Sequence, residues 1–256
     1  MINLKLAKKV AIKAVKSAGK IVAEDFIKSK ETYLKAPRDI VTEVDLKSEK
    51  LIINLISKNF PDHSLLSEEA GFIDKKSDYL WIMDPIDGTT NYIRGIDPFC
   101  VALCLLERVK PIISAIYMPR HKQLYFAAKG EGATLNGKKI KVSDKNIEDS
   151  LAVIDVSSKK DNQDILLTHL RKVLSSGTRM RSWASSLYAL SMVSSGNLDF
   201  CFNFCNKIWD IMPAVLLIQE AGGIVTDING QELTLKSSSV LATNGKIHQQ
   251  VLSLLK

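Results

Sequence analysis

The chain has 256 residues, 46% of them hydrophobic, and a formal net charge of +7 at pH 7. This composition excludes an intrinsically disordered chain, and no run approaches the roughly 18 uncharged apolar residues that a membrane span needs. The first residues are charged from Lys5 onward and lack the apolar run of a secretory signal, so we expect a cytoplasmic protein with no membrane contact. The basic balance is compatible with anionic small molecules or nucleic acid and selects neither.

The first half of the chain predicts two helices followed by a series of strands. Lysines opposite an apolar stripe indicate an amphipathic helix over about residues 3–29, and we interpret its basic face as solvated rather than as a nucleic-acid arm. Thr42 is a candidate N-cap of a second helix over about 44–59, with Asp45 three positions later. We expect strands at 64–67, 80–83, about 99–106, about 111–117 and about 122–128, and a hairpin turn at Asn136-Gly137.

The second half alternates strands and helices more regularly. We expect strands at 151–156, 198–204, 224–228 and 239–242, and helices at about 161–174, 184–195, 210–221 and from about 246. Such alternation predicts a mixed α/β architecture with two sheets. We expect an α+β unit over residues 1–145 and an α/β unit over 146–256, packed as one compact body.

The four cysteines form two pairs with the spacing C-x₃-C: Cys100 with Cys104, and Cys201 with Cys205. Both pairs fall in predicted strands, where residues four apart are separated by about 13 Å. Zinc needs sulfur ligands about 2.3 Å from one centre, so neither pair can chelate it alone. We therefore expect free, buried cysteines that act as small hydrophobic residues.

The segment Asp84-Pro85-Ile86-Asp87-Gly88-Thr89-Thr90 carries the strongest chemical signal. An apolar strand ends at Asp84, and Asp87 follows three residues later. Gly88 and Thr89 then begin a predicted short helix whose free N–H groups suit a phosphate. Two carboxylates beside a phosphate repel it unless a cation lies between them, and hard oxygen ligands select Mg²⁺. The pattern therefore predicts a magnesium-dependent phosphate site.

Other acids are candidates for the same site. Glu68 and Glu69 follow a short apolar strand, Asp45 lies at a helix start, and Asp210 follows Ile208-Trp209. Taken singly, Asp45 and Asp210 are typical of helix caps, and Glu69 is typical of a solvated loop charge. Their association with the segment of Asp84 and Asp87 is what favours a catalytic role.

Together these motifs resemble the inositol monophosphatase family of lithium-sensitive, magnesium-dependent phosphatases. The resemblance covers essentially the whole chain and rests on five motifs in family order: 41–45, 67–69, 84–91, 130–133 with 136–137, and 209–210 with 220–223. It implies a five-layer αβαβα sandwich of the inositol monophosphatase and fructose bisphosphatase type. It also implies a homodimer and sensitivity to lithium.

The resemblance further implies the roles of individual residues. Two or three Mg²⁺ ions would be held by Glu68, Asp84, the carbonyl of Ile86, Asp87 and Asp210. Glu68 and the pair Thr89 and Asp45 would be catalytic, with Thr89 hydrogen-bonded to Asp45 so that it helps to position and deprotonate the attacking water. The backbone N–H groups of Gly88 and Thr89 would hold the phosphate.

The expected substrate pocket departs from the family pattern. Asn203 stands where the family often has a glutamate, seven residues before Asp210, and an amide offers no charge. The small-residue stretch reads Trp183-Ala184-Ser185-Ser186, which adds bulk and polarity. We expect Ala184, Ser185, Ser186, Asn203 and Arg181 to line the pocket, with Arg181 and Lys207 as candidates for binding a second anionic group.

Three functions stay open at this point. The first is hydrolysis of inositol monophosphate or a similar polyol or sugar monophosphate, which the Asp-Gly-Thr-Thr-Asn version of the motif favours. The second is the same chemistry on fructose 1,6-bisphosphate or 3′-phosphoadenosine 5′-phosphate. The third is a non-catalytic role in binding RNA or a transcription complex, which the basic charge permits and does not favour.

Overall fold

The computed structural model describes residues 2–26, 32–36, 39–154, 160–204 and 206–255. The helices of these ranges are α1 (Leu4–Asp25), α2 (Glu43–Asn59), α3 (Thr89–Arg94), α4 (Lys160–Leu174), α5 (Ser186–Ser194), α6 (Met212–Glu220) and α7 (His248–Leu255). Within the same ranges, no helix is long and apolar enough to cross a membrane.

The large sheet has eight strands in the order β10-β9-β8-β7-β6-β5-β3-β4, and only β3 and β5 run parallel. Its strands are β3 (Ser64–Ser67), β4 (Gly71–Ile73), β5 (Tyr79–Asp87), β6 (Cys100–Glu107), β7 (Lys110–Met118), β8 (Gln123–Ala128), β9 (Gly132–Leu135) and β10 (Lys138–Lys139). Asn136 and Gly137 both have positive φ, at 50° and 79°, as the tight turn between β9 and β10 requires.

The smaller sheet has five strands in the order β12-β11-β13-β15-β14. Its strands are β11 (Leu151–Ile154), β12 (Arg179–Arg181), β13 (Phe200–Phe204), β14 (Ile224–Thr226) and β15 (Ser239–Thr243). Strand β11 runs parallel to both of its neighbours, whereas β15 is antiparallel to both of its own. A separate pair, β1 (Thr32–Ala36) and β2 (Asp39–Thr42), forms a short antiparallel hairpin.

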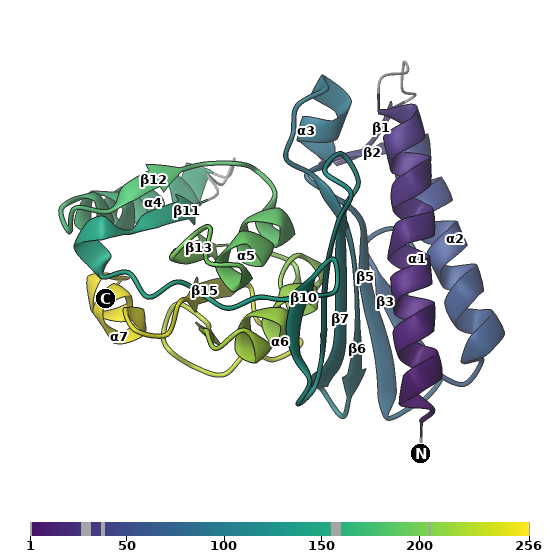
Figure 1. Cartoon of the computed structure of the whole chain (residues 1–256). Coiled ribbons are helices and arrows are strands. Elements are labelled where there is room, and N and C mark those ends of the chain that lie inside the picture. Colours follow the sequence, from purple (N-terminus) through teal and green to yellow (C-terminus); the bar gives the residue numbers. More distant parts are fainter. Residues whose placement is uncertain (1, 27–31, 37–38, 155–159, 205, 256) are drawn as a thin grey trace.

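The five layers of the predicted sandwich are present. Figure 1 shows α1 and α2 against one side of the large sheet, α5 and α6 between the two sheets, and α4 and α7 at the far side of the smaller sheet. Three apolar clusters fill the spaces between these layers. The central one joins strands of both sheets to α5 and α6, and the outer two seat α1 with α2 and α4 with α7. The predicted boundary near residue 145 stays a prediction.

Several predicted bounds were wrong by a few residues. The first helix ends at Asp25 rather than 29, and residues 27–29 lie outside the described ranges. The helix predicted over 184–195 begins at Ser186, because Ala184 has a positive φ of 51° and Ser185 is extended. Asp210 closes a 3₁₀ turn (Ile208–Asp210) before α6 instead of opening that helix.

The cysteine prediction is confirmed for the pair in β6. Cys100 and Cys104 are free and buried there. Cys201 is buried in β13, and Cys205 lies outside the described residues. Burial, followed by the charges of Asp87 and Asp84, raises the pKa of the Cys100 thiol, so this thiol stays protonated.

Candidate functional site

Two neighbouring strands bring Glu68 and Asp84 to the same edge of the large sheet. β3 and β5 run parallel with Ser67 opposite Met83, so the next residue of each strand is an acid. Burial, and then the negative charges of Glu68, Asp87, Asp210 and Asp45 in that order, raise the pKa of Asp84 well above its ordinary range. We call Glu68, Asp84, Asp87 and Asp210 the acidic cluster.

The chain between Asp84 and Asp87 breaks the regular strand pairing. The register of β5 against β6 shifts between these two residues, as in a β-bulge. The Ile86 N–H donates to Asp84 Oδ1 at 3.0 Å. Gly88 follows with φ of 89°, and a Cβ there would lie 3.0 Å from both the Pro98 carbonyl oxygen and the Ser185 Cβ. This turn therefore requires glycine.

Thr89, the first residue of α3, joins the segment of Asp84 and Asp87 to the start of α2. Its hydroxyl lies 2.8 Å from the Ile86 carbonyl oxygen and 3.3 Å from Asp45 Oδ1. Asp45 is buried and forms a capping box with Thr42, whose N–H donates to Asp45 Oδ2 at 2.8 Å. One carboxylate therefore caps α2 with one oxygen and faces the Thr89 hydroxyl with the other.

Asp87 connects the acidic cluster to the second half of the chain. Its Oδ2 accepts from Ser185 Oγ at 2.5 Å, from Leu187 N at 2.9 Å and from Tyr188 N at 3.2 Å, and its Oδ1 accepts from Ser186 N at 3.1 Å. A carboxylate at the first turn of a helix satisfies N–H groups that have no partner within the helix. Asp87 thus acts as the cap of α5.

Asp210 approaches the acidic cluster from the start of α6. Its Oδ2 accepts from the Lys207 N–H at 2.8 Å. Burial raises the pKa of Asp210 from 3.8 to about 7; the charge of Asp87 adds to this shift, and the hydrogen bond from Lys207 opposes it. The carboxyl therefore titrates near neutral pH when no cation is bound to it.

Two of the residues predicted to line the substrate pocket, Ser186 and Asn203, belong to a network of neutral polar groups. Asn203 Nδ2 and Asn206 Nδ2 donate to Ser186 Oγ at 3.0 Å and 2.9 Å, and among the described residues Asn206 Oδ1 is buried with no hydrogen-bond donor. Arg181 is exposed on β12 and donates to the Met180 carbonyl, and Lys207 is also exposed. The structure therefore joins Asn203 to Ser186. The hydrogen bond of Arg181 goes to the Met180 carbonyl and not to this network.

Several residues that support the site were not predicted from the sequence. Asn91 Nδ2 donates to the carbonyls of Pro98 and Trp183 at 2.8 Å and 2.6 Å, which ties α3 to the chain before α5. Ser48 and Glu49 of α2 bind the chain at Pro85 and at residues 67–70. A signal was available for these two, because they follow Asp45 by three and four positions and so share its face of the helix.

The donor set fits magnesium in its chemistry. All four side chains of the acidic cluster offer hard carboxylate oxygens, which Mg²⁺ prefers, and a cation relieves the mutual repulsion that raises the pKa of Asp84. As the side chains stand, however, no three His, Cys, Asp or Glu residues of the described ranges converge on one metal-sized point. Asp84, Asp87 and Asp210 instead accept from nearby backbone N–H groups.

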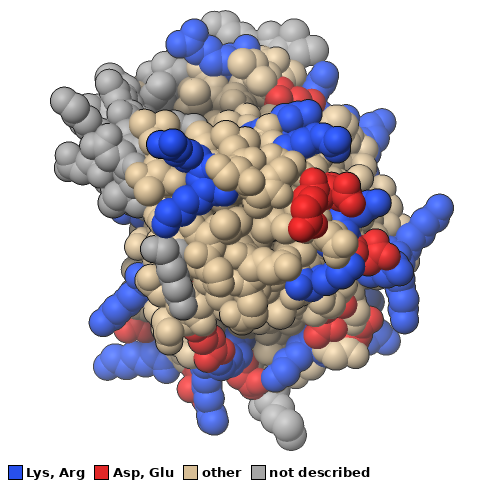
Figure 2. Space-filling view, turned by 90° about the vertical axis from the view of Figure 1, so that its left-hand side faces the viewer, with Lys and Arg blue, Asp and Glu red and all other residues tan. Residues whose placement is uncertain are grey.

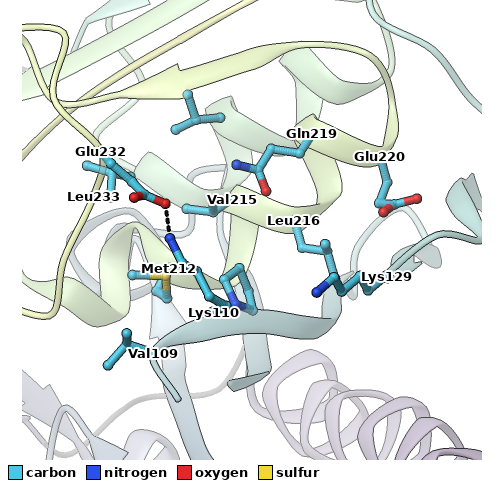
Figure 3. A pocket seen from close by; sticks show the side chains of 12 residues that line it. Val109, Lys110, Lys129, Met212, Val215, Leu216, Gln219, Glu220, Glu232 and Leu233 are labelled. Atoms are coloured by element: carbon cyan, nitrogen blue, oxygen red, sulfur yellow. Dashed lines mark hydrogen bonds and ion pairs between the residues drawn. The ribbon is translucent and has the colours of Figure 1, made fainter. Parts of the chain in front are cut away.

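A separate cavity of about 340 Å³ lies between α6, the turn before β7 and the segment after β14 (Figure 3). Val215, Leu216 and Leu233 form part of its wall, and Lys110 pairs with Glu232 at one side. No residue of the acidic cluster lines it. Glu220 is occupied structurally, because its two oxygens accept from Gly130 N and Gly132 N at 2.7 Å and so tie α6 to the turn between β8 and β9.

Comparison with known proteins identifies the family. The model of the inositol monophosphatase family matches residues 3–256. The chain belongs to the inositol monophosphatase family. It is 35% identical, over all of its length and 97% of the relative, to the fructose-1,6-bisphosphatase/inositol-1-monophosphatase of Aquifex aeolicus. It is 31% identical to the Nus factor SuhB of Pasteurella multocida, over 96% of the chain and 94% of that relative.

Solved structures of similar proteins share the fold. The extragenic suppressor protein SuhB of Bartonella henselae superposes with a TM-score of 0.94, at 30% identity and over 98% of both chains. An inositol monophosphatase/NADP phosphatase, solved in complex with Mg²⁺ and phosphate, superposes with a TM-score of 0.87, at 26% identity and over 99% and 96% of the two chains. The family is magnesium-dependent, and the mixed α/β layered sandwich predicted from the sequence is confirmed.

Proposed function

We propose that this phosphatase hydrolyses the phosphate ester of a small polyol or sugar, with inositol monophosphate as the leading candidate, and that the acidic cluster binds the two or three Mg²⁺ ions that the reaction uses. The observation that carries the proposal is the buried Asp84, whose pKa is raised by burial and then by the charges of the other three acids of the cluster and of Asp45. Buried clusters of like charge are costly unless a cation or a proton neutralises them. When bound, Mg²⁺ neutralises phosphate charge and acidifies a coordinated water.

The residues of the chain would supply positioning and proton transfer. Asp45 lies 3.3 Å from the Thr89 hydroxyl, so it can accept a proton through Thr89 from a water beside the phosphorus. The N–H groups of Gly88 and Thr89 lie at the start of α3, where free donors suit the phosphate oxygens. The carbonyl of Ile86, 2.8 Å from the Thr89 hydroxyl, is the proposed backbone oxygen of the metal site.

The neutral polar network supports a substrate that carries several hydroxyl groups. Asn203, Ser186 and Asn206 offer amide and hydroxyl groups, each able both to donate and to accept. Such groups bind sugar or polyol hydroxyls without selecting a charge. Ala184 and Ser185 precede α5 beside Asp87 and would border the same pocket. If Arg181 and Lys207 bind a second phosphate, replacing both by alanine will lower activity on bisphosphates more than on monophosphates.

The test is release of phosphate in the presence of Mg²⁺ from inositol 1-phosphate, fructose 1,6-bisphosphate and 3′-phosphoadenosine 5′-phosphate. We expect turnover of inositol 1-phosphate, loss of that turnover in Asp87→Asn, and inhibition by lithium. Turnover of either of the other two compounds in place of inositol 1-phosphate would leave the chemistry standing and overturn the proposed substrate. Absence of turnover on all three, with Mg²⁺ bound and the protein folded, would contradict the proposal.

A binding role is the second candidate, because several relatives are named as Nus factors or putative Nus factors. Figure 2 offers it little support on the face shown: the described Lys and Arg side chains lie toward the rim with Asp and Glu among them, around an uncharged centre. A protein that binds RNA through phosphates loses affinity steeply as salt rises. RNA binding with that salt dependence, in a variant without turnover, would favour this second role.

We also propose that the enzyme is a homodimer, which its molar mass in solution will test.

A further inference from the structure

The buried face of α2 carries polar residues where an apolar stripe would be ordinary. Thr42, Asp45, Ser48 and Glu49 recur on one side of the helix start and are at most 5% exposed. We call these four residues the polar stripe of α2. Buried polar groups are retained where they have partners. Asp45, Ser48 and Glu49 each have a partner on a loop of the site, and Thr42 pairs with Asp45.

Glu49 holds the turn that carries Glu68. Its Oε1 accepts from Ser67 Oγ and from the N–H groups of Glu69 and Ala70, both at 3.0 Å. Consecutive N–H groups that point at one oxygen form an anion-binding concavity. Within the described residues, no Lys, Arg or His lies within ion-pair distance of Glu49. The carboxylate is therefore stabilised by the donors of this turn.

The same stripe holds the other two loops of the site. Ser48 Oγ donates to the Pro85 carbonyl oxygen at 3.0 Å, between Asp84 and Asp87 in the chain. Asp45 faces the Thr89 hydroxyl. One rigid helix thus contacts the turn after β3, the bulge of β5 and the start of α3, and it fixes their relative positions.

We infer that Glu49 is a positioning residue for the metal site. By accepting hydrogen bonds from the backbone of the turn at residues 68–70, it holds Glu68 toward Asp84. The inference rests on the proposed function, because it takes Glu68 and Asp84 as ligands of Mg²⁺. The register of β3 and β5 places only the backbone of Glu68, and a three-residue turn leaves its carboxylate several orientations. The hydrogen bonds to Glu49 restrict them. Residues that orient metal ligands in this way contribute about 10–100-fold to metal affinity or activity.

The test is direct binding of Mn²⁺, as a paramagnetic probe in place of Mg²⁺, measured by electron paramagnetic resonance on the full chain. Glu49→Ala should weaken Mn²⁺ binding at least tenfold. Glu49→Gln should recover most of this loss, because the amide oxygen can accept from the same donors. The matched control is Ile52→Val, which perturbs a fully buried residue of the same helix that packs in the core with α1. It should leave Mn²⁺ binding unchanged.

Equal Mn²⁺ binding by Glu49→Ala and the wild type would overturn the inference and leave the proposed function intact. A wild type that binds no Mn²⁺ would overturn both. If Glu49→Ala does not fold, Ser67→Ala provides the same test, because it removes one of the three donors to Glu49. Weaker Mn²⁺ binding by Ser67→Ala, at unchanged melting temperature, would support the inference, and unchanged binding would overturn it.

Discussion

Replacing Asp210 by asparagine should stabilise the metal-free protein at pH 8 while destroying its use of Mg²⁺. Burial raises the pKa of Asp210 from 3.8 to about 7, and this difference corresponds to a cost of about 4 kcal/mol for the ionised carboxylate. The side chain is only half-buried, so solvent screening reduces this to about 2 kcal/mol. The amide keeps an acceptor for the Lys207 N–H and carries no charge.

The pH dependence gives this prediction its sign. A carboxyl whose pKa is higher in the folded state binds a proton more readily there, so its destabilising effect is largest above pH 7 and shrinks as the pH falls toward 4. In chelator, Asp210→Asn should therefore melt about 4–8 °C above the wild type at pH 8, and by clearly less at pH 5. Glu148→Gln, at an exposed acid, is the control and should change little at either pH.

Addition of Mg²⁺ should reverse the order of the two proteins. A ligand at a hundred times its dissociation constant stabilises the folded state by about 2.7 kcal/mol. The wild type alone should gain this amount, which exceeds the roughly 2 kcal/mol by which Asp210→Asn is more stable without Mg²⁺. Thermal unfolding by circular dichroism, with and without Mg²⁺ at both pH values, measures all four conditions. An Asp210→Asn variant no more stable than the wild type in chelator at pH 8 would refute the reasoning that the ionised Asp210 carboxylate destabilises the metal-free folded protein.

Three further outcomes are expected. Thr89→Val keeps the shape of the side chain and removes the hydroxyl that faces Asp45, so kcat should fall about 10²–10⁴-fold with little change in KM; an unchanged kcat would remove Thr89 from proton transfer. Gly88→Ala places a methyl group against Ser185 at a left-handed φ, so it should lower the free energy of unfolding by about 1–2 kcal/mol from the backbone alone, and calorimetry should show a lower melting temperature. Burial lowers the pKa of His248, so its protonation in the unfolded state should make stability fall as the pH drops below about 6.5; an NMR titration that gives His248 a pKa above this value would contradict the prediction.

Local features of the fold were predictable from the sequence because their causes lie within a few residues. The capping box of Thr42 and Asp45 and the turn at Asn136-Gly137 need only neighbouring side chains and backbone, and both are present in the structure. The end of the helix predicted over 184–195 was right to within one residue, because the helix ends at Ser194 and Gly196 follows with a positive φ. Its start was wrong because residue 184 takes a left-handed conformation that alanine does not signal.

The composition of the acidic cluster was predictable as a set of residue types, and its geometry was not. The sequence determined that Glu68, Asp84, Asp87 and Asp210 occur in family order, and hence the reaction class. Only the tertiary structure decided that the parallel register of β3 and β5 sets Glu68 beside Asp84, and that Asp87 caps a helix 98 residues further along the chain. Contacts of this kind depend on how separate elements pack, and packing joins residues whose sequence separation carries no local signal. The supporting role of Glu49 follows the same rule, because the turn that it holds becomes its neighbour only when α2 lies against the large sheet.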